Sequence, residues 1–283
     1  KDSIPILIKG LKRLEYRGYD SSGVALFDDN RLVCLKKAGK VSDLKSLIED
    51  TPYRGTTGIA HTRWATHGEP NDINAHPQLD KTGKIALVHN GIIENHETIR
   101  EVLISKGISM TSQTDTEVLV NLISMIYYQD DGISFQDAVR AALGEVIGAY
   151  GIATICLDEP DKIIIAKLGS PLVIGIGDKE YFIASDASPI IEHTRNVIYL
   201  DDGEMACITR NNHQITDIDS SKILTKTVTE IDMSIDEIEK GQFPHYMLKE
   251  IFDQTQSITN TMRGRLNLDD GTTQLGGITD YMP

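Results

Sequence analysis

Two stretches of this sequence place a dense set of polar side chains directly after a short apolar run. The first reads GIAHTRWATHGEP over residues 58–70, and the second reads KIALVHNGIIEN over residues 84–95. This pattern is typical of a buried strand that delivers polar side chains to a loop at its end. Two strand ends that each present a polar loop predict one shared pocket.

The residue types in this region suit the recognition of an amino acid. Arg63 can bind a carboxylate through charge-assisted hydrogen bonds. Asp115 falls in the first turn of a predicted helix, where the helix dipole favours an ionised carboxylate that can receive an ammonium group. Thr114 and Glu117 also fit a capping box at this helix start, which is the purely structural interpretation of the motif.

The dipeptide Asn90-Gly91 has two interpretations. Between apolar runs, Asn-Gly can form a type I′ hairpin turn. Here Ile92-Ile93 and then a predicted helix follow, so we expect a junction between a strand and a helix. At such a junction a glycine lets backbone N–H groups approach a ligand closely, as the stabilisation of an oxyanion requires.

Other kinds of catalytic site fit the sequence less well. Five of the eight histidines fall within one short region, namely His61, His67, His76, His89 and His96. This region has no H-E-x-x-H motif and the chain has no paired cysteine spacing, so we expect no metal site. A G-x-S-x-G elbow is also absent. Cys34, Cys156 and Cys207 each fall in an apolar strand, where a thiol is inert, so the attacking group must come from elsewhere.

Composition narrows the class of protein. The net charge of −14 at pH 7 argues against binding to nucleic acid or to an anionic membrane surface, because both are polyanions. The sequence contains no apolar stretch long enough to span a membrane and no signal-peptide pattern. Three scattered cysteines do not suggest a disulfide framework, so we expect a reducing compartment, with the cytoplasm as the default.

Hydrophobic periodicity predicts the order of the elements. Helices are expected at residues 4–14, 41–48, 94–106, 118–127, 135–143 and 245–262. Strands are expected at residues 24–27, 32–36, 150–157, 162–167, 172–176, 180–184, 197–200, 204–209 and 213–217, besides the two strands of the opening motifs. Ser3 is a candidate N-cap of the first helix, and a helix this close to Lys1 leads us to expect residues before it. The turn-rich end after the last helix leads us to expect further domains.

Four polar motifs together resemble a known family. They are LEYRGYDS at 14–21, HTRWATHG at 61–68, VHNGIIEN at 88–95 and QTDTE at 113–117. In this order they closely resemble the glutaminase domain of the glutamine–fructose-6-phosphate aminotransferases (isomerising), which are class II amidotransferases. The likeness continues in SPLVIG at 170–175, ASDA at 184–187 and HYMLKEI at 245–251, so it spans nearly the whole chain.

The resemblance implies a fold and a reaction. The fold is α+β, an N-terminal-nucleophile (Ntn) hydrolase with a four-layer αββα sandwich and two stacked, mainly antiparallel sheets. In the reaction, an N-terminal cysteine thiolate attacks the side-chain amide of glutamine, releases ammonia and leaves a thioester that water cleaves. The free α-amine of this cysteine can act as the base. We expect the cysteine a short way before the position of Lys1, and we expect no cofactor.

The resemblance also implies roles for the residues of the two polar motifs. Arg63 would hold the α-carboxylate of glutamine, and Asp115 would hold its α-ammonium group. The Asn90 side chain and the Gly91 N–H would form the oxyanion hole.

Five further residues would surround these groups. Trp64, Thr66 and His67 would line the glutamine-binding loop. Arg17 and Gly18 would lie beside the nucleophile. Arg17 could instead simply pair with Asp20 across the local turn, which is the structural alternative.

The domain organisation follows from the same likeness. Residues 1–230 would form the glutaminase domain, and residues 231–283 would form a linker and a helix leading to sugar-isomerase domains. Those domains would use the ammonia to convert fructose 6-phosphate to glucosamine 6-phosphate, and the intact enzyme would be a homodimer.

Two alternatives to this function remain open. The chain could be the glutaminase domain of another class II amidotransferase, such as amidophosphoribosyltransferase, which shares the fold and an Arg and Asn-Gly pair. It could also be a non-catalytic module that binds an amino acid, if the mature polypeptide does not begin with cysteine. The identity of that first residue discriminates the enzyme from the binding module.

Overall fold

The structure is a computed structural model that describes residues 2–49, 53–64, 68–129, 132–232, 243–262, 266–267 and 272–273. The chain divides into two compact units, Lys1–Asp232 and Met233–Pro283. The first unit contains both polar motifs of the sequence. We describe each unit by itself.

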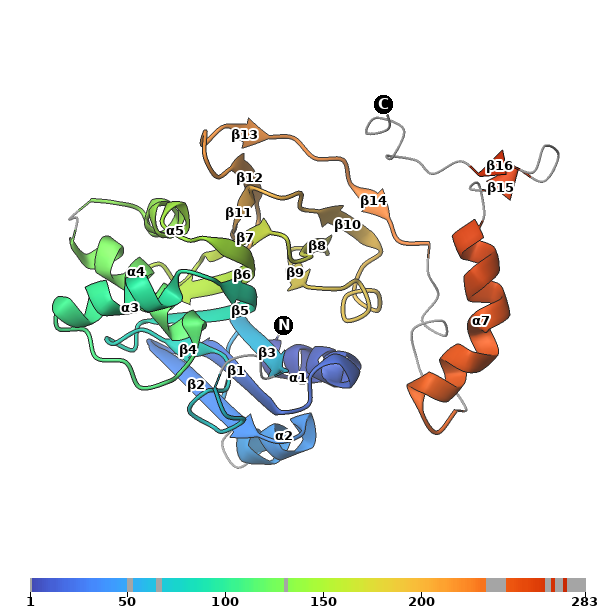
Figure 1. Cartoon of the computed structure of the whole chain (residues 1–283), viewed down its shortest axis with the longest axis horizontal. Helices are drawn as coiled ribbons and strands as arrows, with labels where there is room; N and C mark the ends of the chain where they lie inside the picture. The colour runs from blue at the N-terminus through green and yellow to red at the C-terminus, as the bar shows by residue number, and fades with distance from the viewer. Residues whose placement is uncertain are drawn as a thin grey trace. The chain divides into compact units, whose positions relative to one another are not determined.

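The first unit combines helices, which precede β6 in the chain, with antiparallel strands (Figure 1). Its helices are α1 (Ser3–Leu14), the 3₁₀ helix η1 (Glu15–Arg17), α2 (Val41–Glu49), α3 (His96–Ser105), α4 (Asp115–Gln129) and α5 (Phe135–Gly144). Its first strands are β1 (Ser21–Asp28), β2 (Arg31–Ala38), β3 (Gly58–Arg63), β4 (Gln78–Leu79), β5 (Ile85–Ile93), β6 (Gly148–Cys156) and β7 (Ile163–Leu168). The remaining strands are β8 (Val173–Ile176), β9 (Tyr181–Ala184), β10 (Asn196–Tyr199), β11 (Glu204–Ile208), β12 (His213–Asp217), β13 (Ile223–Leu224) and β14 (Thr229–Glu230).

The strands form one large sheet and two smaller ones. The large sheet has seven strands in the order β13-β12-β11-β7-β6-β5-β4. The smaller sheets have the orders β2-β1-β3 and β14-β10-β8-β9. Neighbouring strands within these sheets are antiparallel, including the expected hairpin of β1 and β2.

Alternation along β5 shows how the layers pack. Ile85 and Leu87 are fully buried against α3, α4 and α5 on one face of the large sheet. Ala86 and Val88 point to the opposite face and join an apolar cluster with residues of β1, β3, β8 and β10. Successive side chains of a strand point to opposite faces, so a strand buried on both faces is apolar almost throughout. The large sheet is therefore covered by helices on one face and by the smaller sheets on the other.

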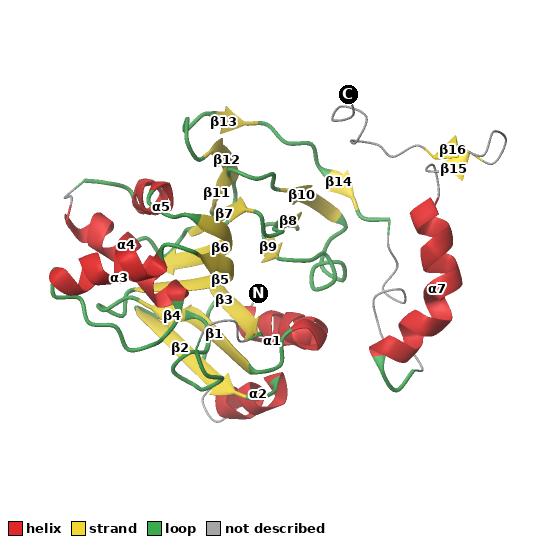
Figure 2. Cartoon of the chain, viewed as in Figure 1, coloured by secondary structure: helices red, strands yellow, loops and turns green. Residues whose placement is uncertain are grey.

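A third apolar cluster covers the outer face of the β2-β1-β3 sheet. Ile8 and Leu11 of α1 and Leu44 of α2 pack there on Val24 and Leu26 of β1. The order of layers is thus helix, sheet, sheet and helix, with separate apolar clusters between them (Figure 2). The four-layer α+β sandwich expected from the sequence is confirmed.

The two opening strands extend further than expected, because His61 to Arg63 lie within β3 and His89 to Gly91 lie within β5. β3 continues to Arg63 by pairing with β1, and β5 continues to Ile93 by pairing with β6. The expected junction between strand and helix at Asn90-Gly91 is therefore wrong. The dipeptide lies inside β5, and α3 begins only at His96. β1 and β6 supply the backbone hydrogen-bond partners that extend β3 and β5, and a local sequence pattern does not show these distant pairings.

Two helix starts also differ in detail from the expectation. The N-cap of α1 is Asp2 rather than Ser3, and its carboxylate accepts a hydrogen bond from the N–H of Ile4. At α4 the expected capping box forms only by half, because the Thr114 hydroxyl accepts the N–H of Glu117. The Glu117 carboxylate instead accepts hydrogen bonds from the loop that precedes the helix.

The second unit contains α7 (Tyr246–Met262) and the short pair β15 (Leu266–Asn267) and β16 (Thr272–Thr273). Phe243 and Phe252 stack at a centroid distance of 5.4 Å. Nζ of Lys249 in α7 lies 3.7 Å from Oδ2 of Asp253 on the next turn. Within the described residues of the chain, none of the helices has the length and apolar character needed to cross a membrane.

The loop before α4 depends on Glu117, which is 4% exposed. Its carboxylate accepts the N–H of Thr111 at 2.7 Å, the Thr111 hydroxyl at 2.8 Å and the N–H of Ser112 at 2.6 Å. The substitution Glu117→Ala removes both acceptor oxygens and with them all three hydrogen bonds, so we expect the free energy of unfolding to fall by ~2–4 kcal/mol. Urea denaturation measures this, with the exposed Glu101→Ala of α3 as the control, expected within ~0.5 kcal/mol of wild type. If Glu117→Ala were as stable as Glu101→Ala, the Glu117 carboxylate would not stabilise the loop before α4.

Candidate active site

A cavity of about 740 Å³ in the first unit is lined by several layers at once. β3 and β9 line it along their whole length, β5, β6, β7 and β11 contribute residues from the large sheet, and α1 contributes from the outer layer. Among the described strands, β3 pairs only with β1 and β9 pairs only with β8. Both strands therefore have an edge without a partner strand, and both line the same cavity.

Most of the predicted site residues line this cavity. These are Arg17, Arg63, Trp64, Asn90, Gly91 and Asp115. Gly18 is not among the lining residues, but it approaches the end of β3, where an added Cβ would lie 3.0 Å from the carbonyl oxygen of Thr62. The predicted residues Thr66 and His67 lie outside the described residues.

Arg63, the last residue of β3, is a buried cation and is only 4% exposed. Burial lowers the pKa of its guanidinium, and the nearby carboxylates of Asp115 and Asp20 raise it. Burying a charge is costly unless opposite charges compensate it. A guanidinium held in this way, at the wall of a cavity, can bind a carboxylate through two parallel hydrogen bonds.

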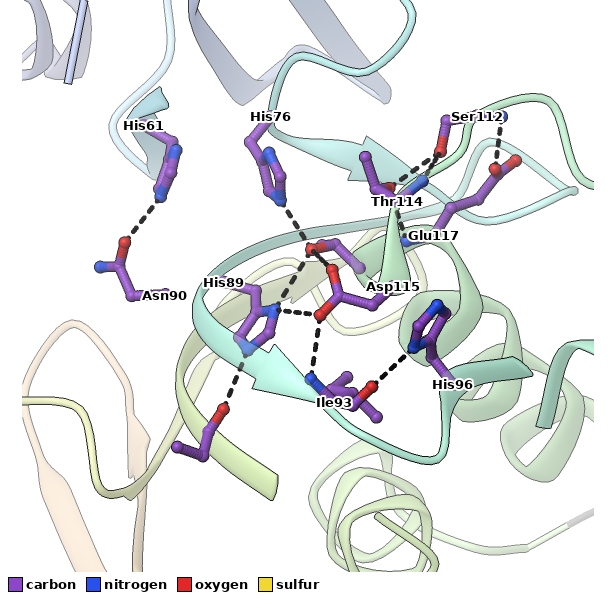
Figure 3. Close-up of polar contacts among 12 residues, drawn as sticks. His61, His76, His89, Asn90, Ile93, His96, Ser112, Thr114, Asp115 and Glu117 are labelled. Carbon is purple, nitrogen blue, oxygen red and sulfur yellow. Dashed lines mark hydrogen bonds and ion pairs between the residues drawn. The ribbon is translucent and has the colours of Figure 1, made fainter. Parts of the chain in front are cut away.

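Asp115 provides the opposite charge at the start of α4. Its side chain is buried, and one carboxylate oxygen accepts the N–H of Ile93 at 3.0 Å (Figure 3). The helix N-terminus also favours a negative charge at this position. The arrangement leaves a fixed carboxylate on the cavity wall, which is suited to receive an ammonium group.

Asn90 and Gly91 lie side by side on β5 at the cavity wall. Gly91 has a φ of +129°, and an added Cβ would collide with the carbonyl oxygen of Ala149, so only glycine fits. The Oδ1 atom of Asn90 lies 3.0 Å from Nε2 of His61, a histidine of β3 (Figure 3). Within the described part of the chain, the Nδ2 amide of Asn90 has no hydrogen-bond partner.

Arg17 and Trp64 lie at more open positions of the cavity. Arg17 forms an ion pair with Asp186 at 3.3 Å and a hydrogen bond to the hydroxyl of Ser185 at 3.2 Å. Trp64 is 59% exposed and meets the ring of Tyr19 edge-on at a centroid distance of 5.5 Å. The cavity thus has a buried charged end and a more exposed rim.

Three histidines form a cluster beside these groups on the cavity wall, with His76 and His89 buried and His61 half-buried, and the sequence did not predict this cluster. Nε2 of His76 lies 2.6 Å from the Thr116 hydroxyl, and Nδ1 of His89 lies 3.2 Å from the same hydroxyl. The ring of His61 lies against that of His76, with centroids 4.8 Å apart. The only signal in the sequence was the clustering of histidines, and we had considered it only as evidence for a metal.

The hydrogen-bond partners determine how the protons are placed. Nε2 of His89 faces the carbonyl oxygen of Ala149 at 3.4 Å and must carry the proton, since a carbonyl only accepts. The Thr116 oxygen can accept from Nε2 of His76, and its one proton faces both Nδ1 of His89 at 3.2 Å and the Asp115 carboxylate at 3.5 Å. Burial lowers the pKa of all three histidines, to about 4 for His61, so all are neutral at pH 7.

A further contact joins the two loops that flank Arg63 and Asp115. The Asn74 side chain accepts the N–H of Gln113 at 2.9 Å and donates to the Gln113 side-chain oxygen at 3.1 Å. The same oxygen accepts the N–H of Glu69 at 3.3 Å. This pair fixes the segment after Gly68 to the segment before Asp115. Nothing in the local sequence pattern predicted it.

The three cysteines lie in β2, β6 and β11, as expected. Burial raises the pKa of Cys34 and of Cys156 to about 11, and it also raises the pKa of Cys207. Thiols in such surroundings are poor nucleophiles at neutral pH. Among the described residues, no three His, Cys, Asp or Glu side chains are grouped in a way that could hold a metal ion.

The neutral histidines make stability depend on pH. Because the folded pKa of His76 lies well below its ordinary value of 6.5, the unfolded chain binds a proton below pH 6.5 that the folded chain does not. The free energy of unfolding therefore falls with pH below about 6.5, by ~1.4 kcal/mol per pH unit for each such histidine. The amide of glutamine can still donate to Thr116 but does not titrate. We therefore expect His76→Gln to reduce the slope of the free energy of unfolding against pH by the contribution of one histidine.

Urea denaturation of both proteins from pH 7.5 to pH 5 measures this difference. The free energies of unfolding of the two proteins should differ by a constant amount above pH 7. Below pH 6 the free energy of the wild type should fall more steeply than that of His76→Gln. Curves that stay parallel over the whole range would show that His76 is not buried as a neutral group.

Comparison with known families and proteins agrees with this geometry. A family model described as "Glutamine amidotransferase domain" matches residues 42–233, which is more than half of the chain. The glutamine–fructose-6-phosphate aminotransferase (isomerizing) of Chlorobaculum tepidum is 52% identical over 285 aligned residues and is matched by 100% of this chain. The protein of the same name from Bacteroides thetaiotaomicron is 50% identical, over 99% of this chain. The chain spans only 46% of the length of either relative.

Solved structures show the same fold. The glutamine phosphoribosylpyrophosphate amidotransferase of B. subtilis, complexed with ADP and GMP, superposes with a TM-score of 0.67 at 24% identity, over 78% of this chain and 48% of that chain. A structure described as the allosteric regulatory enzyme of purine biosynthesis gives 0.66 at 26% identity, over 76% of this chain and 46% of its own. These superpositions confirm the fold class expected from the sequence. The chain belongs to the glutamine amidotransferase domain family.

Proposed function

We propose that this chain is the glutaminase domain of a glutamine–fructose-6-phosphate aminotransferase. It hydrolyses the side-chain amide of L-glutamine and supplies ammonia for the conversion of fructose 6-phosphate to glucosamine 6-phosphate in amino-sugar biosynthesis. One observation carries the proposal: a buried guanidinium, a buried carboxylate and a carboxamide line a single cavity. The names of relatives at 52% and 50% identity support the choice of sugar substrate.

The groups on the cavity wall match those of glutamine. Arg63 would bind the α-carboxylate and Asp115 the α-ammonium group, so both backbone charges of the substrate would be compensated in a buried site. The amide at the far end of the substrate would then reach Asn90 and Gly91. Nδ2 of Asn90 and the N–H of Gly91 would stabilise the negative charge that develops on the carbonyl oxygen.

Trp64, Thr66 and His67 follow β3 in the sequence and would line the glutamine-binding loop. Trp64 supports this role by lying on the open rim. Arg17 and Gly18 would lie beside the nucleophile, at the end of the cavity where Gly18 approaches β3.

The nucleophile would be a cysteine at the N-terminus of the mature polypeptide, ahead of Lys1. The cavity supports this proposal, since it is bounded by β3 and β9, each of which has an edge without a partner among the described strands, and by residues of the large sheet. An extended segment could pair with both edges there and carry its first residue to the charged end. The cysteine thiolate would attack the amide carbon, its α-amine would transfer the proton to the leaving ammonia, and water would cleave the thioester.

The intact protein would contain further domains. Residues 1–230 would form the glutaminase domain, and residues 231–283 would lead to sugar-isomerase domains that receive the ammonia. The relatives support this organisation because each is about twice as long as this chain. We propose a homodimer located in the cytoplasm, and free cysteines support the reducing compartment.

Experiments on the full-length protein also test two other functions, namely a glutaminase domain with another acceptor and a non-catalytic module that binds an amino acid. Likeness of fold to the phosphoribosylpyrophosphate amidotransferase favours a related glutaminase that serves another acceptor. Ammonia release with glutamine, followed by transfer to fructose 6-phosphate but not to phosphoribosyl pyrophosphate, discriminates the two. A mature N-terminus other than cysteine, determined by intact mass, would leave only the binding module.

The oxyanion role of Asn90 predicts a loss of turnover. Loss of one oxyanion donor typically lowers turnover ~10²–10³-fold, so we expect Asn90→Ala of the full-length protein to lose kcat while the KM for glutamine changes little. A glutamate-release assay measures both constants, with the exposed Asn211→Ala as the control. Unchanged turnover of Asn90→Ala would remove this residue from the oxyanion hole.

The carboxylate-binding role of Arg63 predicts a loss of affinity instead. A charge-assisted hydrogen bond contributes ~1.5–3 kcal/mol, so Arg63→Ala should raise the KM for glutamine roughly 10- to 150-fold. Arg31→Ala, which changes an exposed arginine of β2, is the matched control. A KM equal to that of wild type would mean that Arg63 does not hold the substrate.

A further inference from the structure

The orientation of the Asn90 carboxamide decides whether the proposed oxyanion hole can work. One end of the group, Nδ2, donates hydrogen bonds, and the other end, Oδ1, only accepts them. An oxyanion needs Nδ2, whereas Oδ1 in the same place would repel it. A rotation by half a turn would exchange the two ends, so a neighbouring group has to fix the orientation.

His61 is the neighbour that contacts this group. Its Nε2 lies 3.0 Å from Oδ1 of Asn90, across from β3 to β5 (Figure 3). Both residues line the cavity. The bond is possible in this orientation only if Nε2 of His61 carries the proton, since Oδ1 has none to give.

The surroundings of His61 favour that proton position. Nδ1 of His61 is buried and has no hydrogen-bond partner within the described residues. The backbone of His89 lies beside the ring but forms no hydrogen bond with Nδ1, so a proton there would be a buried donor without an aligned acceptor, while an unprotonated Nδ1 leaves only a lone pair unsatisfied. A positively charged ring would carry both protons, but burial lowers the pKa of His61 to about 4 and keeps the ring neutral at pH 7.

The ring of His61 is also held in place. It packs on His76, whose own Nε2 is bound to the Thr116 hydroxyl at 2.6 Å. Thr116 follows Asp115 directly on α4, and its hydroxyl lies 3.5 Å from the Asp115 carboxylate. Asn90, the proposed oxyanion donor, and Asp115, the proposed ammonium acceptor, are therefore connected through His61, His76 and Thr116.

We propose that His61 is a positioning residue: as the neutral Nε2–H tautomer it holds Oδ1 of Asn90 and thereby aims Nδ2 at the substrate oxygen. The inference rests on the proposed glutaminase function for its kinetic readout. His61 does not touch the reacting atoms, and it acts only through Asn90.

Two substitutions of similar size separate this role from a general role in packing. In His61→Gln the side-chain amide nitrogen can reach the place of Nε2, and in His61→Asn it reaches only the place of Nδ1. We expect His61→Asn of the full-length protein to lose ~10²-fold in kcat with a nearly unchanged KM for glutamine. We expect His61→Gln to recover most of this loss. Equal kcat values for the two variants, or an effect confined to KM, would overturn the proposal.

A double-mutant cycle with Asn90→Ala adds a second test. If His61 acts only through Asn90, adding His61→Asn to Asn90→Ala should lower kcat no further. A structural defect would lower the activity of both backgrounds by the same factor, and that result would overturn the proposal.

The tautomer can be tested without any enzymatic activity. The ¹⁵N chemical shifts of the His61 ring, assigned by comparison with His61→Gln, should show a protonated Nε2 and an unprotonated Nδ1 at pH 7. The opposite tautomer or a charged ring would overturn the proposal. If the wild-type protein releases no ammonia from glutamine, the proposed function fails, whereas the NMR result still decides how Asn90 is held.

Discussion

The constraint on which the rest of this structure depends is the burial of opposite charges at one end of a cavity. Arg63 and Asp115 come from different layers and are both almost inaccessible to solvent. Either charge alone would be strongly destabilising there, because burying an unpaired charge removes its hydration without an opposite charge to compensate for it. Burial lowers the pKa of the Arg63 guanidinium, and the carboxylates of Asp115 and Asp20 partly offset this shift. A substrate that brings one charge of each sign fits this end of the cavity without leaving either group uncompensated.

The layers of the fold position these charges. Arg63 ends β3 of one sheet, Asn90 lies on β5 of the other, and Asp115 begins α4 on the far face of the large sheet. The three residues meet because the sheets stack face to face and α4 points its N-terminus at the end of β5, where Asp115 accepts the N–H of Ile93. The neutral histidines fill the space between these elements. They supply polar contacts without adding a charge that would disturb the balance.

The sequence predicted the family and the layered fold better than the path of the backbone at the candidate site. Residue types and the order of four motifs identified the family and the layered fold, because both depend on side chains that local patterns display. The path of the backbone through Asn90-Gly91 could not be predicted, since it depends on pairing with β6, far along the chain. The same limit applies to the contact of His76 with Thr116, 40 residues apart. The buried carboxylate of Glu117 also served the preceding loop rather than the expected reciprocal cap.

The central claim is that Arg63, Asp115 and Asn90 bind one amino acid together. A crystal structure of the full-length protein with its product L-glutamate tests this most directly. The account predicts the α-carboxylate on Arg63, the α-ammonium group on Asp115 and one oxygen of the side-chain carboxylate within hydrogen-bond distance of Nδ2 of Asn90. Glutamate bound outside this cavity, or bound inside it with its α-carboxylate away from Arg63, would contradict the account.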